Sequence, residues 1–241
     1  MDNSNYIQNC KTTKITYDRI TINNSDIAFK KVKTKEIYFH CLYPIKKPKC
    51  IEAWENILHC EISWDDICKI MNKSIQGNKQ KQLHWKIIHR ALYSEVRLAK
   101  MGKSNGFCQL CNIAQETICH LFFNCIKIRI IWNKVQNLIS EIVNRNFVLS
   151  IENVIFGIND KEIKVLNYII NLIIYESKWH IWKNRNAVKY GHKECLSEEA
   201  LYQNIENGYK LQYKLFRESQ HGENIKAKID ELLGILDEEN A

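Results

Sequence analysis

The sequence predicts a mainly α-helical protein with a small β-hairpin near its N-terminus. Only 8 Gly and 2 Pro occur among 241 residues, so few positions interrupt regular structure. Apolar residues recur at helical spacing through most of the chain after residue 50. Alternation of β-branched and polar residues is confined to the first 32 positions. A hydrophobic fraction of 45% is sufficient for a buried core.

The predicted hairpin rests on a turn signal between two short apolar runs. Residues 14–22 alternate apolar and polar side chains and predict one strand, and residues 27–32 predict the returning strand. Asn, Asn, Ser and Asp at 23–26 are typical turn residues. Helical spacing over 34–44 then gives way to a lysine-rich linker that contains Pro48.

The remaining elements are predicted to be helices, because apolar residues return every three or four positions. On residues 79–92 we expect Trp85, Ile88 and Leu92 to face the core. The stretch 144–153 is predicted to be a less regular connection. The expected helices are one after residue 50, one capped by Ser63, 79–92, a short one from Ser94 to near Gly102, 128 to about 143, 161–190 and 197–237.

These patterns predict three segments, and net charge distinguishes the last of them from the first two. We expect an N-terminal segment over 1–50, a central domain over 51–140 and a helical region over 141–241. Residues 1–140 hold 22 Lys and Arg against 11 Asp and Glu, whereas 141–241 hold 13 against 16. The basic excess is greatest over 71–103, with eight cations and one acid. A local excess of this kind is typical of a phosphate-binding surface.

Four of the ten cysteines crowd into 18 positions and point to a metal site. Cys108 and Cys111 are followed by His120 and Cys125, a C-x2-C-x8-H-x4-C spacing. Three thiolates and one imidazole complete the closed shell of a structural zinc ion. Because Cys119 adjoins His120, a four-cysteine set with Cys119 as third ligand fits the spacing as well.

The same stretch resembles the reverse-transcriptase zinc-binding domain, which follows the polymerase in many LINE-like, non-LTR retrotransposon proteins. The likeness covers about 51–135 and is densest over 105–132, and a weaker likeness continues over 179–186. In the family pattern the histidine follows Glu-Thr by three residues, which implies that His120 is the third ligand. The residues that carry the resemblance are Trp85, His89, Arg90, Arg97, Leu98, Cys108, Cys111, Glu116, Thr117, His120, Leu121, Phe122, Cys125 and Trp132.

Catalysis is not expected. The Asp-Asp pair, Asp65 and Asp66, follows Ser63 and predicts a helix start rather than the strand hairpin that holds a polymerase's aspartates. Neither a nuclease carboxylate set nor a Gly-rich phosphate loop is recognisable. The sequence therefore predicts a non-catalytic module of retrotransposon origin.

The first functional hypothesis is binding of RNA or single-stranded DNA next to the zinc site. Basic side chains would contact phosphates, and Phe107 or Phe122 would stack on unpaired bases, although an apolar setting favours a core position for Phe122. The predicted phosphate contacts are Lys79, Lys86, Arg90, Arg97, Lys100 and Lys103.

Two alternatives remain open at this point. The chain is either a protein-interaction or purely structural helical domain, with 141–241 as the docking region, or an inert retrotransposon remnant. The polar first residues and the lack of a long apolar run predict an intracellular chain without a membrane span, in the nucleus or the cytoplasm. No small-molecule substrate is expected.

Overall fold

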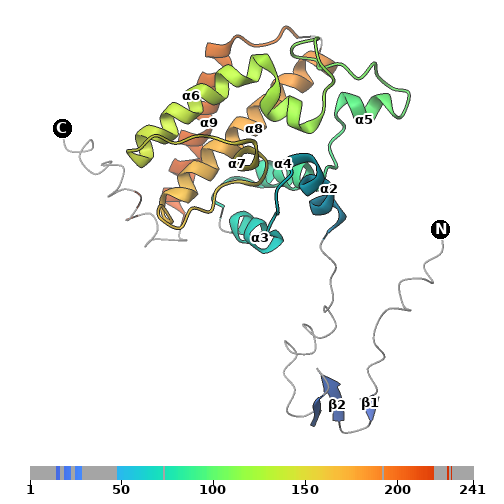
Figure 1. The fold of residues 1–241 in the computed structure, drawn as a ribbon. Helices are drawn as coiled ribbons and strands as arrows, with labels where there is room; N and C mark the ends of the chain where they lie inside the picture. The colour runs from blue at the N-terminus through green and yellow to red at the C-terminus, as the bar shows by residue number, and fades with distance from the viewer. Residues whose placement is uncertain are drawn as a thin grey trace. The chain divides into compact units, whose positions relative to one another are not determined.

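The computed structural model describes residues 15–16, 19–22, 25–28, 48–72, 74–191, 193–219, 227 and 229. The chain divides into two compact units, Met1–Pro48 and Lys49–Ala241. The predicted segments 51–140 and 141–241 thus lie within one unit. Figure 1 shows the helices of this unit and the strands of the other.

The first unit contains an antiparallel sheet with strand order β1-β2-β3. Its strands are β1 (Ile15–Thr16), β2 (Arg19–Ile22) and β3 (Ser25–Ala28). Ile22 pairs with Ser25, so two residues separate β2 from β3, as the turn signal predicts. The single strand expected over 14–22 is in fact two strands that pair with each other. The helix predicted over 34–44 lies outside the described residues.

The described part of the second unit is helical, which confirms the predicted fold class. Ser63 accepts a hydrogen bond from the Asp66 amide (3.3 Å), so it caps α3 as expected, and the aspartate pair lies in the first helical turn. The helices are α2 (Lys49–Leu58), α3 (Trp64–Asn72), α4 (Asn78–Ile88), α5 (Glu95–Ala99), the π-helix η3 (His120–Asn124), α6 (Ile126–Val143), α7 (Ile151–Phe156), α8 (Leu166–Gly191) and α9 (Glu198–Glu218).

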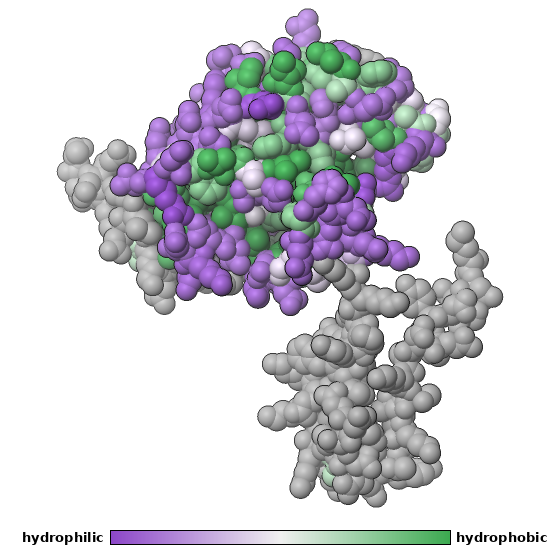
Figure 2. Space-filling model, viewed as in Figure 1, coloured by the Kyte–Doolittle hydropathy of each residue, from purple (hydrophilic) through white to green (hydrophobic). Residues whose placement is uncertain are grey.

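Helix α8 lies at the centre of this unit. It contacts α9, α4 and α6, and the side chains of Ile170, Ile173, Ile174 and Ile181 have no exposed area. Burial on several faces explains why apolar residues are nearly continuous along its first half. Figure 2 shows mostly hydrophilic side chains on one face of the unit, with apolar patches between them. Among the described residues no helix is both long and apolar enough to cross a membrane.

Helix α4 faces the core differently from the prediction. Its buried positions are Gln80, Leu83, His84, Ile87 and Ile88, the spacing of one helical face. The expectation that Trp85 faces the core was wrong: its side chain is 45% exposed. Because Gln80 and His84 on the buried face are polar, the pattern of apolar positions did not indicate this face.

The buried polar residues of α4 are paired with α8. His84 Nδ1 lies 2.7 Å from the Lys178 amine, and His84 Nε2 lies 2.9 Å from the Tyr175 hydroxyl. Lys178 also donates to the carbonyl of Val154 (2.7 Å). Burial lowers the pKa of Lys178 and of His84, which favours the neutral form of each.

Helix α7 occupies part of the stretch predicted to be irregular. Its six residues are too few to show a helical period. Ser150 and Asn153 form a reciprocal capping box at its N-terminus. At its C-terminus Gly157 has φ +94°, and a Cβ atom there would lie 2.7 Å from Asn171 Oδ1. This close approach explains the glycine.

Candidate metal centre

The structure brings the side chains of Cys108, Cys111, His120 and Cys125 together. One ligand atom from each residue lies within 4.8 Å of all the others. The sulfurs of Cys108 and Cys125 are 3.9 Å apart, and the Cys111 sulfur is 3.4 Å from His120 Nε2. Zinc bonds of about 2.3 Å to sulfur and about 2.0 Å to nitrogen place tetrahedral neighbours about 3.8 Å and about 3.5 Å apart. The four residues therefore fit a tetrahedral zinc ion.

The first two ligands lie on a tight turn that local hydrogen bonds close. The Cys108 amide donates to the carbonyl of Ala114 (2.8 Å), and the Asn112 amide donates to the carbonyl of Cys108 (2.8 Å). Asn112 has φ 55°, a left-handed conformation that asparagine tolerates. Because two residues separate the cysteines, the turn presents both sulfurs to one point.

The other two ligands flank a π-helical turn. The Cys125 amide donates to the carbonyl of His120 (2.8 Å), so five residues close one turn. In an α-helix, residues five apart would point about 140° away from each other. The wider turn reduces this divergence and lets both side chains reach the same point. Thr117 Oγ1 accepts a hydrogen bond from the His120 amide (3.0 Å) and orders the start of the turn.

Cys119 is not a member of the cluster found among the described residues. Its side chain lines a groove on the surface together with Cys50 and His89. Burial raises the pKa of the Cys119 thiol. Of the two ligand sets that the spacing allows, the structure assembles the one with His120.

Contacts and burial within the cluster shift the pKa values of Cys108, His120 and Cys125. Contact with Cys108 lowers the pKa of Cys125, and the same contact raises the pKa of Cys108. Cys125 is therefore the first thiolate of the pair, and the amide of Lys127 at the start of α6 also stabilises it. Burial lowers the pKa of His120, so its imidazole is neutral, the form that binds metals.

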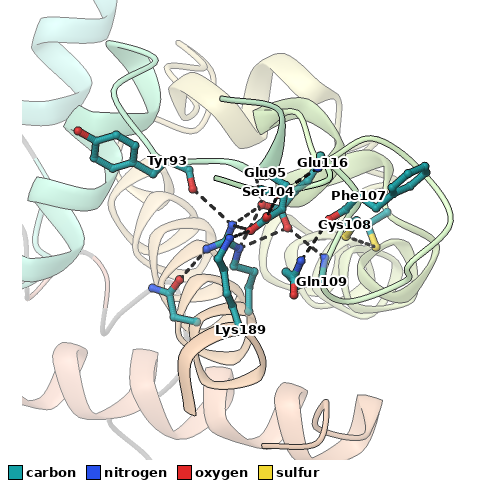
Figure 3. Close-up of polar contacts among 12 residues, drawn as sticks. Tyr93, Glu95, Ser104, Phe107, Cys108, Gln109, Glu116 and Lys189 are labelled. Atoms are coloured by element: carbon teal, nitrogen blue, oxygen red, sulfur yellow. Dashed lines mark hydrogen bonds and ion pairs between the residues drawn. The ribbon is translucent and has the colours of Figure 1, made fainter. Parts of the chain in front are cut away.

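A buried ion pair holds the cysteine turn against α8 (Figure 3). Glu116 and Arg185 both have no exposed area. The Arg185 guanidinium donates to Glu116 through Nη2 (2.7 Å) and Nε (3.1 Å). The other Glu116 oxygen accepts from the Gln109 amide (3.2 Å), which lies between the first two ligands. Glu116 therefore connects the metal turn to a residue 69 positions later.

A second carboxylate completes this network. Glu95 is 1% exposed, and its side chain contacts Arg185, Lys189 and Ser104. The Glu95 amide donates to Glu116 Oε1 (3.0 Å), and Arg185 Nη2 contacts a carboxylate oxygen of both acids. Sequence reasoning assigned no role to any of these residues. Glu116 and Arg185 lie within segments that carry the family resemblance. That resemblance was the only sequence signal for their importance.

All six predicted phosphate contacts are exposed. The groove beside residues 117–119 brings together Arg90, Arg97 and Lys100, and it adds Lys49. Lys79, Lys86 and Lys103 are not among the residues that line it. Arg90 follows the end of α4 and has φ 52°, so it lies beyond the helix, which was predicted to extend over 79–92.

The two aromatic candidates differ in exposure. The Phe107 side chain is 42% exposed, whereas that of Phe122 has no exposed area. Phe122 belongs to the core, and its carbonyl accepts a hydrogen bond from the Trp132 indole (2.6 Å). Of the two, only Phe107 is available for stacking.

Comparison with known proteins agrees with this geometry. Residues 49–132 match a protein family described as zinc-binding in reverse transcriptase. No curated protein matches the chain. The matched residues include the whole Cys/His cluster and the turns that position it. Residues 49–132 are therefore consistent with a reverse-transcriptase zinc-binding domain, and they hold a Cys3His cluster positioned to bind a metal ion.

Proposed function

We propose that this chain is a non-catalytic nucleic-acid-binding module that contacts RNA or single-stranded DNA beside its zinc site. The observation that carries the proposal is the state of the six basic residues. All are exposed, and in the part of the chain that the structure describes none of them pairs with a carboxylate. Unpaired surface cations are available to neutralise phosphates.

The metal's role in this proposal is structural. A Cys3His set occupies all four positions of a tetrahedral ion, the pattern of zinc sites that stabilise a fold. When bound, zinc would hold the cysteine turn against η3. The cysteine turn also places Phe107 on the surface. It places residues 117–119 beside Arg90, Arg97 and Lys100.

The test is fluorescence anisotropy of a labelled single-stranded RNA at several salt concentrations. The Lys79→Glu/Lys86→Glu/Arg97→Glu variant should bind more weakly than the wild type. If these residues make three phosphate contacts, the slope of log K against log salt should become shallower by about 2. A control of the same kind, Lys161→Glu/Lys164→Glu, reverses two exposed lysines elsewhere on the second unit, and the two variants are compared per reversed charge.

Two results would refute the proposal. A folded, zinc-loaded wild type that binds neither RNA nor single-stranded DNA would exclude the function. Equal weakening per reversed charge in the test and control variants would show that only net charge matters.

The alternative, a protein-interaction domain, has one observation in its favour. Leu211 and Leu215 lie four residues apart on α9 and are 55% and 51% exposed. An apolar pair on one helix face suits contact with another protein. If α9 mediates self-association, Leu211→Ser/Leu215→Ser should shift sedimentation towards the monomer and leave RNA binding unchanged.

A further inference from the structure

The groove that contains Arg90, Arg97 and Lys100 has the chemistry of a ligand site. It lies between α2, the turn after α4, α5 and residues 117–119, and its volume is about 520 Å³. Small-molecule sites commonly have about 300–1,000 Å³. The metal ligands are not part of its lining. It is therefore a feature separate from the metal centre, although the two adjoin.

The lining carries positive charge. Lys49, Arg90, Arg97 and Lys100 contribute four cations, and no Asp or Glu is among the described residues that line the groove. The Arg97 guanidinium donates to the carbonyl of Arg90 (3.1 Å) and lies 4.9 Å from the Tyr93 ring centre. These contacts limit its freedom before a ligand arrives. The groove thus favours an anionic group.

The lining is also apolar and aromatic. Trp54, Ile57, Leu92 and Ile118 contribute to it. The Trp54 indole donates to the carbonyl of Ile88 (2.8 Å), which fixes its ring, and the Arg90 guanidinium lies 5.7 Å from the ring centre. The Trp54 side chain is 1% exposed, so a flat aromatic ligand would contact Ile57, which is 41% exposed, and the Arg90 guanidinium.

A polar atom in the groove wall lacks a partner. His89 lines the groove, and its Nε2 atom is buried with no hydrogen-bond partner within the described residues. Its Nδ1 atom lies 3.6 Å from the Cys50 sulfur. Buried polar atoms without partners are uncommon, so a missing partner next to this wall is itself an observation.

We infer that this groove binds one unpaired nucleotide of a single strand, with the base against the apolar lining and the adjoining phosphates on the four cations. The inference rests on the proposed function and assigns it a site. Charge complementarity selects an anion, and the combination of an exposed apolar side chain and a guanidinium plane selects a flat base over an acidic peptide. A duplex would offer the phosphates but not a free base.

The test compares a single-stranded RNA with an abasic strand of equal length, which keeps the phosphates and lacks the bases. The wild type should bind the normal strand about tenfold more tightly, since one base stacked on a protein side chain contributes about that much. Ile57→Glu places a charge on the lining and should abolish this preference. The matched control Ile113→Glu, at a 73% exposed position outside the groove, should keep it.

A second readout uses Cys50, which lines the groove and is partly exposed. Adenosine monophosphate should slow iodoacetamide alkylation of Cys50, measured by mass spectrometry, whereas inorganic phosphate at equal concentration should not. This arm works without any RNA binding. Protection by the nucleotide alone supports the groove even if the strand fails to bind.

Two results would overturn the inference. Equal affinity for normal and abasic strands, with binding still lowered by reversal of Lys79 and Lys86, would refute the groove and keep the proposed function. No binding of either strand together with no protection of Cys50 would refute both.

Discussion

Replacement of Arg185 by methionine should destabilise the second unit more than any comparable change at a surface arginine. Methionine keeps much of the length of the side chain and removes the guanidinium. Glu95 and Glu116, which are 1% and 0% exposed, would then keep two carboxylates in the interior. Removal of one partner from a buried ion pair costs about 3–5 kcal/mol. Lys189 still contacts Glu95, so we expect a value near the lower end.

Urea unfolding followed by circular dichroism at pH 7, with zinc bound, measures this loss. Arg145→Met is the matched control, because Arg145 also contacts two acids, Asp160 (2.6 Å) and Glu162 (2.5 Å), but is 42% exposed. Exposed pairs contribute about 0–1 kcal/mol. A loss for Arg185→Met no greater than that for Arg145→Met would refute the reasoning.

The stability of the Arg185→Met variant should also depend on pH. Without the guanidinium, two buried carboxylates would share one remaining cation, Lys189, and their mutual repulsion would favour uptake of a proton by the folded state. Stability of Arg185→Met should therefore increase as the pH falls from 7 towards 5. Glu116→Gln combined with Arg185→Met should recover part of the loss, since one buried charge is then absent.

Three further changes test other parts of the structure. Cys111→Ser should lose zinc and helical signal, whereas Cys119→Ser should keep both, measured by zinc content and circular dichroism. Burial raises the pKa of Glu176 to about 7, so folding favours its protonated form and stability falls as pH rises from 4.5 to 7. Glu176→Gln should remove this dependence and gain about 3 kcal/mol at pH 7 in urea titrations. Gly157→Ala should cost above about 2 kcal/mol and Gly102→Ala, with open space around it, about 1 kcal/mol.

Each of these has an outcome that contradicts it. Full zinc content in Cys111→Ser would refute the ligand set. An unchanged pH profile in Glu176→Gln would assign the dependence to another group on α8, such as His180. Equal costs at the two glycines would show that the contact with Asn171 is unimportant.

The metal cluster could be predicted because its information is local. Cys108, Cys111, His120 and Cys125 lie within 18 positions, and their spacing alone restricts them to a compact turn. The choice between Cys119 and His120 depends on which side chain the π-helical turn directs inward. Spacing contains no information about that direction, so only the family resemblance pointed to His120.

The Glu116–Arg185 pair could not be predicted in the same way, because its partners are 69 residues apart and belong to different elements. The prediction of the buried face of helix α4 was wrong for another reason. Gln80 and His84 are polar and buried because Glu176, Lys178 and Tyr175 on α8 supply their hydrogen bonds. Hydropathy assigns such residues to the surface, so Trp85 was placed in the core in their stead.

The position of Arg185 determines which fragment of this chain can fold as an isolated domain. The family match ends at residue 132, but the counter-ion for Glu95 and Glu116 lies on α8, more than 50 residues later. A fragment cut at the end of the match would retain every metal ligand and lose the cation that neutralises the turn's own acids. The smallest fragment that keeps these buried charges balanced therefore extends through α8.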